Sequence, residues 1–286
     1  MVFIKSSFAL VALFSAFAFS APVRREVPQE HSHEPILTEV RTSLNLNNPD
    51  KIVDPVFALL GNAAAAAGAG DITNLDCLQQ AVADQAFTNA KAAGDTDGMV
   101  NALIFRALER NTGKVGLASV LCTETAVNAE VAAISQHQDP ASSGAAATNK
   151  AIVLELAKQI ASIGGNPLDA LKSGTFAPGD VNDATAKGNT CDDANDANGC
   201  IFTQNLLVDD ATEDEINAAV AGISSGSGAS ATATSNGSTA TDSCADTTVT
   251  VTVTAAATAT ADATATCAAP TSTVTITVTP TATARR

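Results

Sequence analysis

The sequence contains no tryptophan and no tyrosine, and its aromatic content is 3%. Proteins that recognise sugars or nucleic-acid bases by stacking use those side chains as platforms, so we do not expect this mode of binding. Histidine is scarce as well, with only His31, His33 and His137 in the chain. The commonest general base of enzymes is therefore in short supply. Gly-x-Ser-x-Gly, HExxH, P-loop and GxGxxG motifs are also missing, and we predict no catalytic residues, no cofactor and no enzymatic activity.

Positive charge is also limited: 15 Lys and Arg residues face 30 Asp and Glu residues, which gives a formal net charge of −15. A nucleic-acid-binding surface needs clustered basic residues, so we expect no nucleic-acid partner. An anionic membrane surface would repel such a chain. The acidity favours solubility and says little about the fold.

Residues 1–20 have the pattern of a secretory signal peptide. Lys5 supplies the positive charge, Phe8–Phe19 is the apolar run, and small residues at Ala18 and Ser20 favour cleavage after Ser20. The apolar run is shorter than the ~20 residues that a transmembrane helix needs. We therefore predict a secreted protein, placed outside the cell or in the cell wall.

Residues 21–34 are predicted to be a propeptide and a disordered arm. The pair Arg24-Arg25 is typical of processing by kexin-type proteases, which would make Glu26 the first residue of the mature chain. The alternative is an accidental dibasic pair in a flexible segment.

Residues 224–286 differ sharply in composition, since almost half of them are Ser or Thr. Two runs with β-strand alternation, Val249–Thr254 and Thr273–Thr279, could pair as a weak hairpin, or the tail could be a disordered O-glycosylated stalk. Asn236 begins an N-glycosylation sequon. A second apolar span is missing, and the Thr/Val alternation after Thr271 is not the hydrophobic tail of ~10–20 residues that a GPI signal needs, so we expect neither a transmembrane segment nor a GPI anchor.

Six cysteines in a secreted chain indicate disulfide bonds. Fifteen pairings are possible for six cysteines. Proximity along the chain favours three of these bonds: Cys77–Cys122, Cys191–Cys200 and Cys244–Cys267. Free or metal-bound thiols are the alternative, and the missing CxxC spacing disfavours it.

Residues 35–223 are rich in Ala, Leu, Val and Ile at helical spacing, with Gly and Asp at the expected ends of helices. Short loops between such helices favour a disulfide-stapled antiparallel bundle, so the predicted fold class is all-α. In that bundle Cys77 and Cys122 would join two helices. Residues 174–206 break the pattern and are predicted to be a loop closed by Cys191 and Cys200. The expected helices cover residues 51–67, 75–86, 95–108, 115–134, 144–163 and 212–223.

Two stretches have some of the residues of a metal site. Asp192–Gly199 resembles a calcium loop, but Ala194 stands where an EF-hand needs its first oxygen ligand. His31–Glu34 could chelate copper or zinc, but it belongs to the arm predicted to be disordered. His137 is expected at a helix end, where a cation is favourable to the helix dipole. We therefore predict no metal site in either stretch.

Four stretches of the chain stand out: Val53–Asn62, Arg106–Gly116, Ser135–Pro140 and Gly199–Leu207. Together they resemble a family of secreted or cell-wall proteins of filamentous ascomycete fungi. The likeness covers roughly residues 35–223, and the tail is similar only in composition to the stalks of fungal wall proteins. The resemblance implies an extracellular or wall location and brings no catalytic or binding residues with it.

Taken together, the sequence predicts a non-enzymatic extracellular or cell-wall protein with a structural or surface role, whose expected partners are wall polysaccharide or wall proteins. An alternative is a secreted helical module that binds an apolar ligand or a host partner between its helices. An enzyme would need a cleft that joins acids such as Asp192, Asp193 and Asp196 with a helix terminus, and we consider this the weakest of the three.

Overall fold

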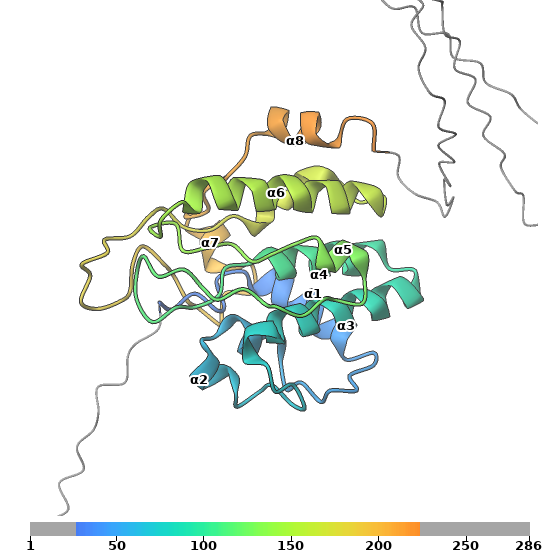
Figure 1. Cartoon of the computed structure of the whole chain (residues 1–286), viewed down its shortest axis with the longest axis horizontal. Coiled ribbons are helices and arrows are strands. Elements are labelled where there is room, and N and C mark those ends of the chain that lie inside the picture. The colour runs from blue at the N-terminus through green and yellow to red at the C-terminus, as the bar shows by residue number, and fades with distance from the viewer. Residues whose placement is uncertain (1–26, 224–286) are drawn as a thin grey trace, which may run out of the picture. The chain divides into compact units, whose positions relative to one another are not determined.

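The computed structural model describes residues 27–223, and this part of the chain is helical (Figure 1). No strand is present between residues 27 and 223, where one isolated antiparallel bridge pairs Thr175 with Val208. The all-α prediction is therefore confirmed for these residues. The elements are α1 (Glu34–Leu44), η1 (Pro55–Leu59), α2 (Asn62–Ala65), η2 (Leu75–Cys77), α3 (Leu78–Ala93), α4 (Thr96–Ala107), α5 (Ala129–Ala132), α6 (Ala145–Ser162), η3 (Pro167–Ser173), α7 (Cys200–Thr203) and α8 (Glu213–Val220), where η marks a 3-10 helix.

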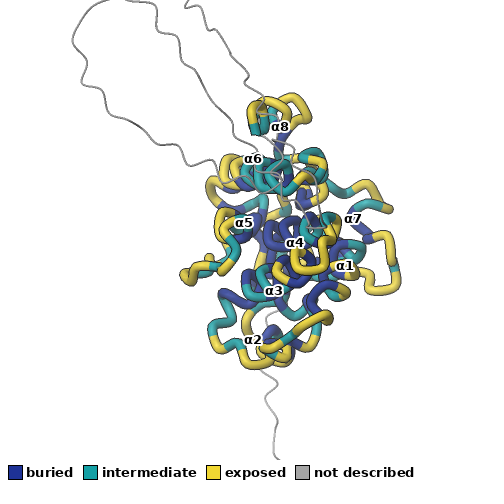
Figure 2. The backbone as a smooth tube through the Cα atoms, turned by 90° about the vertical axis from the view of Figure 1, so that its right-hand side faces the viewer, coloured by how far each residue is buried: buried dark blue, intermediate teal, exposed yellow. Residues whose placement is uncertain are grey.

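Helix α4 lies at the centre of the core. It contacts α1, α3, α5, α6 and η3, and its tube is dark blue in Figure 2 because most of its residues are buried. Asp95 accepts a hydrogen bond from the backbone N–H of Gly98, so it caps the helix as its position in the sequence predicted. Leu103, Ile104 and Phe105 are at most 1% exposed. Burial of these large side chains contributes hydrophobic stabilisation at the centre of the core.

Helices α6 and α8 form at their predicted positions, and α3 begins within its predicted range of residues 75–86 but continues to Ala93. Gly94 ends α3 in the left-handed conformation, with φ of 70°, which glycine adopts without steric cost. Thr212 and Glu215 form a complete capping box at the start of α8. The longest helix is α6, with 18 residues. Between residues 27 and 223, no helix combines the length and the apolar character needed to cross a membrane.

The prediction of a helix over residues 115–134 is wrong. Only α5 is helical there, and residues 113–128 run across the surface without regular structure. Side chains from other segments satisfy backbone groups of this stretch: Gln136 donates to the Val120 carbonyl and Gln80 to the Glu124 carbonyl, both at 2.8 Å. In a helix these carbonyls would accept hydrogen bonds from backbone N–H groups four residues later. Because the side chains of Gln136 and Gln80 bond them instead, the irregular conformation is favoured.

The predicted helix over residues 51–67 is also wrong as one continuous element. It divides into η1 and α2, with Leu60 and Gly61 extended between them. The backbone N–H of Asn111 donates to the Leu59 carbonyl at 2.7 Å, and the Arg110 side chain donates to the carbonyls of Ala58 and Leu60. These carbonyls are bonded to another part of the core, which explains why the helix does not continue through them.

Residues 27–34 are packed against the core, which corrects the prediction of a disordered arm. Val27 is 3% exposed and its backbone N–H donates to the Thr112 carbonyl at 3.0 Å. Helix α1, which the sequence analysis did not identify, follows at once with Pro35 in its first turn and Leu37 and Val40 fully buried. Contacts with distant residues order this polar segment, so its composition alone gave the wrong expectation.

Two disulfide bonds form, and both are pairings that sequence proximity favoured: Cys77–Cys122 and Cys191–Cys200. The first joins η2 to the irregular stretch that contains Cys122, so the expected staple between two helices is wrong. The third predicted pair, Cys244–Cys267, lies outside the described residues. So do Ser20, Arg24 and Arg25, the predicted processing residues, and Asn236.

Candidate functional site

The longest uninterrupted buried stretch between residues 27 and 223 is Ala102–Thr112, and its second half is polar. Three further buried segments contribute polar side chains beside it. Two stretches of the fungal resemblance, residues 106–116 and 135–140, supply most of this group. We call these residues the polar centre: Ser32, His33, Arg106, Glu109, Arg110, Gln136, His137, Asp139 and Thr175.

His137 joins the two stretches of the polar centre. Its backbone N–H donates to the Ala107 carbonyl at 2.8 Å, and its ring Nδ1 lies 2.6 Å from the same oxygen. A carbonyl only accepts, so Nδ1 carries a proton in this contact. Ring Nε2 lies 3.3 Å from an Asp210 carboxylate oxygen. The residue is fully buried and follows α5 by several positions, so it does not end its own helix as predicted; it binds the last carbonyl of α4 instead.

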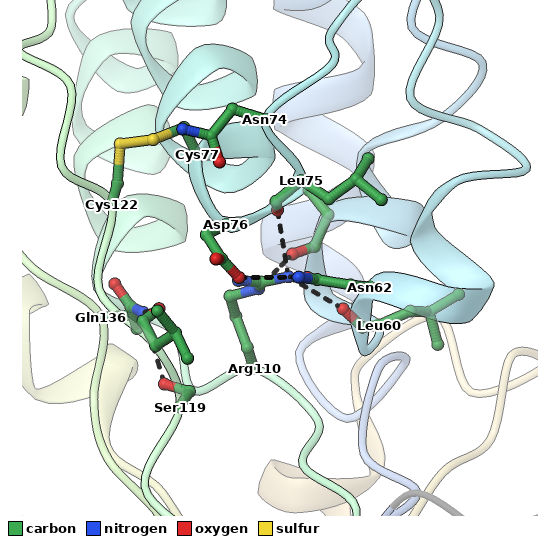
Figure 3. A network of polar contacts seen from close by, with 12 residues as sticks. Leu60, Asn62, Asn74, Leu75, Asp76, Cys77, Arg110, Ser119, Cys122 and Gln136 are labelled. Carbon is green, nitrogen blue, oxygen red and sulfur yellow. Dashed lines mark hydrogen bonds and ion pairs between the residues drawn. A yellow bond between two sulfur atoms is a disulfide. The ribbon is translucent and has the colours of Figure 1, made fainter.

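Arg110 organises the loops on the other side of the polar centre (Figure 3). It is 3% exposed, and its guanidinium donates to the carbonyls of Ala58, Leu60 and Leu75 and to the side chain of Asn62. Asp76 lies 4.0 Å away as its ionic partner. A planar guanidinium with five donors suits such a convergence of acceptors. One side chain therefore fixes η1, the start of α2 and η2 against the end of α4.

Arg106 points toward amide side chains. Its two terminal nitrogens lie 3.1 Å from Gln136 Oε1 and 3.4 Å from Gln80 Oε1. Burial, together with the nearby charge of Arg110, lowers the pKa of Arg106 to about 10. The guanidinium stays charged at neutral pH, so these neutral acceptors hold a buried cation in place.

Glu109 is the most strongly perturbed acid of the polar centre. Burial raises its pKa to about 7, although the Thr175 hydroxyl donates a hydrogen bond to its Oε2. A cavity of about 10 Å³, lined in part by Val27, Glu109 and Asp139, adjoins it. This volume suits a single water molecule and no larger reactant. Although perturbed acids often mark active sites, we assign Glu109 a structural role because a substrate has no room beside it.

His33 is perturbed in the opposite sense. Burial lowers its pKa to about 4, even though ring Nε2 lies 3.1 Å from the Gly174 carbonyl, which favours the protonated form. The Ser32 hydroxyl lies 2.9 Å from Nδ1, and the Phe202 ring meets the imidazole edge-on. The ring is therefore neutral in the folded protein at neutral pH.

These two pKa shifts predict a measurable pH dependence of stability. Glu109 has a raised pKa, so its contribution to the free energy of unfolding is full below about pH 4.5. This contribution is lost as the pH rises through about 7. Glutamine cannot titrate, so Glu109→Gln should gain about 3 kcal/mol of unfolding free energy relative to the native chain between pH 4.5 and 7. Urea unfolding of both proteins at each pH measures this difference. A difference that stays constant over this range would show that Glu109 ionises freely in the folded state.

His33 should partly hide this effect in the native protein. Because its pKa is lowered, His33 contributes to the free energy of unfolding above about pH 6.5, and this contribution is lost as the pH falls through about 4. The slopes of the two residues have opposite signs and overlap between about pH 4.5 and 6.5. The difference in unfolding free energy between the native chain and Glu109→Gln is therefore needed to isolate the effect of the Glu109 carboxyl, because His33 titrates equally in both proteins.

A groove large enough for a small molecule lies on the surface between α1, η3, α4 and α7. Its volume is about 480 Å³, within the range of ligand pockets. Its lining includes the apolar residues Ile36 and Phe202, and a neighbouring polar hollow shares Glu39, Asn101 and Lys172 with it. Its lining comes from segments far apart in the sequence, so no local motif could have predicted it. The lining residues are Pro35, Ile36, Thr38, Glu39, Asn101, Lys172, Ala197 and Phe202.

The two stretches considered as metal loops in the sequence meet in the structure. The backbone N–H and ring Nδ1 of His31 each lie 2.9 Å from Asp192 Oδ1. Asp193 and Asp196 instead form local turns within their own loop, through hydrogen bonds to Asn195 and Asn198. The acids considered for an enzymatic cleft are therefore not brought to one point.

Comparison of the chain with models of protein families, with curated proteins and with solved structures found no match, so the function is argued from the chain's own residues.

Proposed function

We propose that this chain is a secreted, non-enzymatic protein of the cell surface or cell wall, of the type found in filamentous ascomycete fungi. The observation that carries the proposal is the pair of disulfides Cys77–Cys122 and Cys191–Cys200 in a chain with a signal-like leader. Disulfides form and persist in oxidising compartments, and they are compatible with an extracellular protein. The similarity of residues 35–223 to fungal wall proteins adds to this argument.

In this proposal residues 35–223 act as a disulfide-tied antiparallel helical bundle. The polar centre fixes the loops of this body, because Arg110 and His137 each bond backbone carbonyls of other segments. Residues 224–286 would carry O-linked sugars and Asn236 an N-linked one, which suits contact with wall polysaccharide or wall proteins. The role is structural, at the surface of the cell.

Intact-mass analysis and peptide mapping of the natural protein, recovered from culture medium and from walls, test this proposal. We expect a chain that begins at Glu26, carries three disulfides and bears glycans after residue 223. Protein found only inside the cell, with Met1 retained and all six thiols reduced, would overturn it.

The groove between α1 and α7 favours a second candidate function, the binding of an amphipathic small molecule. Ile36 and Phe202 offer an apolar surface, while Glu39 and Lys172 offer charged groups next to it. This arrangement suits a ligand with an apolar body and a polar end.

Displacement of a neutral apolar dye, N-phenyl-1-naphthylamine, tests the second candidate. Thr38 is an exposed groove residue of α1, and a tryptophan there would fill the groove, so we expect Thr38→Trp to weaken dye binding at least tenfold. Thr88 is an exposed threonine of α3 away from the groove, and Thr88→Trp should bind as the native protein does. Equal binding by both variants would exclude the groove as the site.

A further inference from the structure

Three potential metal ligands from two distant segments lie together on the surface. Glu30, His31 and Asp192 each offer one ligand atom, and these atoms all lie within 4.8 Å of one another. The side chains of His31 and Asp192 are 27% and 26% exposed, so an ion from solution can reach them. The segment before α1 and the loop closed by Cys191–Cys200 therefore share one cluster.

Neighbouring groups hold two of these ligands in place. Glu30 Oε2 accepts hydrogen bonds from the Asn111 amide at 2.7 Å and from the Gln29 backbone N–H at 3.1 Å. Asn111 is 5% exposed, and its own Oδ1 is buried without a hydrogen-bond partner among the described residues. Asp192 follows the disulfide residue Cys191, which limits the movement of its loop. Carboxylate ligands of metal sites are typically oriented by such second contacts.

The chemistry of the cluster favours zinc. One imidazole nitrogen and two carboxylates form a ligand set that Zn²⁺ takes, with water in the fourth position, whereas Ca²⁺ and Mg²⁺ prefer oxygen ligands alone. Ligand atoms of a tetrahedral zinc site lie about 3.3 Å apart, given zinc–ligand distances near 2.0–2.1 Å. His31 Nδ1 and Asp192 Oδ1 are already 2.9 Å apart, and the Glu30 ligand atom lies within 4.8 Å of both, so small adjustments bring the three atoms to these spacings.

We propose that Glu30, His31 and Asp192 form a surface zinc site. Zinc binds the lone pair of His31 Nδ1 in the neutral tautomer that carries its proton on Nε2; a proton held at Nδ1 in the zinc-free contact with Asp192 is exchanged through solvent to Nε2. The other two histidines of the chain, His33 and His137, are 6% and 0% exposed. Any zinc bound through an imidazole of the folded protein therefore uses His31. The bound ion would join the segment before α1 to the Cys191–Cys200 loop.

Isothermal titration of the full secreted chain with zinc chloride tests the site. We expect one ion per chain with a micromolar dissociation constant, and a loss of at least tenfold in affinity for His31→Ala and for Asp192→Asn. Asp193→Asn is the matched control, since this neighbouring acid lies outside the cluster, and it should bind zinc as the native chain does. Absence of binding at 1 mM zinc, or equal affinity in His31→Ala, would overturn the proposal.

A second measurement uses the native chain and does not depend on how a variant folds. Of the three imidazole rings, only that of His31 should change its proton NMR resonances when zinc is added at neutral pH. Resonances of His33 and His137 should keep their positions because their rings are buried. A zinc-induced change at either buried ring with none at His31 would equally contradict the assignment. Either result of this measurement leaves the proposed extracellular role untouched, because it reports only whether zinc binds His31.

Discussion

A Cys77→Ala/Cys122→Ala variant is expected to lose about 4 kcal/mol of its free energy of unfolding. The bridge closes a loop between residues 45 positions apart, and without it the unfolded chain regains conformational entropy. Cys122 also lies in the irregular stretch 113–128, where Val115 is the only buried residue. Loss of the bridge should therefore loosen this stretch as well. Urea unfolding followed by circular dichroism measures the first effect, and limited proteolysis within residues 113–128 measures the second.

The second disulfide provides the matched control. In each bridge one cysteine is fully or almost fully buried, Cys77 and Cys200, and its partner is half-buried, so the two bonds differ chiefly in loop length. Cys191 and Cys200 are only nine positions apart, and their removal should cost roughly 2.5 kcal/mol. A larger loss from the short loop than from the long one would show that local packing, not chain entropy, governs these bonds.

The Arg110→Met variant is expected to lose about 3–5 kcal/mol of unfolding free energy. Methionine keeps the unbranched apolar stem but leaves the carbonyls of Ala58, Leu60 and Leu75 without the donor that they share. Buried carbonyls that lose their hydrogen bonds carry the full cost of desolvation. Because three segments of the core bond to this side chain, its replacement should lower the stability of the whole domain. Unfolding should remain a single cooperative transition rather than begin with one loosened loop.

The Arg41→Met variant serves as the control for this prediction. Arg41 also pairs with carboxylates, at Asp54 and Glu34, but its side chain is 33% exposed and water can replace its partners. Exposed ion pairs contribute about 1 kcal/mol or less. Urea unfolding of both variants compares the two sites directly. A cost for Arg110→Met no greater than that for Arg41→Met would mean that water reaches the freed carbonyls of the core.

The helices that could be predicted from sequence are those whose signals are local. Asp95 before α4 and Thr212 with Glu215 at α8 act within one turn of their own helix. The two failures have a common physical cause. Residues 51–67 and 115–134 have helical composition, but their carbonyls bond to side chains or backbone from segments that lie far away in sequence.

The candidate site was only partly accessible from sequence for the same reason. The sequence analysis singled out residues 106–116 and 135–140, but the burial of Glu109 and His137, which gives these residues their properties, depends on the whole fold. The zinc cluster required an arm and a loop to meet across 161 positions. The two disulfides between residues 27 and 223 were easier to predict, because each joins cysteines that are neighbours along the chain.

The packing of Val27 bears on when the chain can be processed. A protease that cuts after Arg25 must take Val27, the second residue beyond the cut, into its own binding cleft in an extended form. In the folded chain that residue is 3% exposed and its N–H is bonded to Thr112. If the proposed cleavage after Arg25 takes place, it must therefore precede the packing of Val27, because the folded chain holds this residue and its N–H against the core.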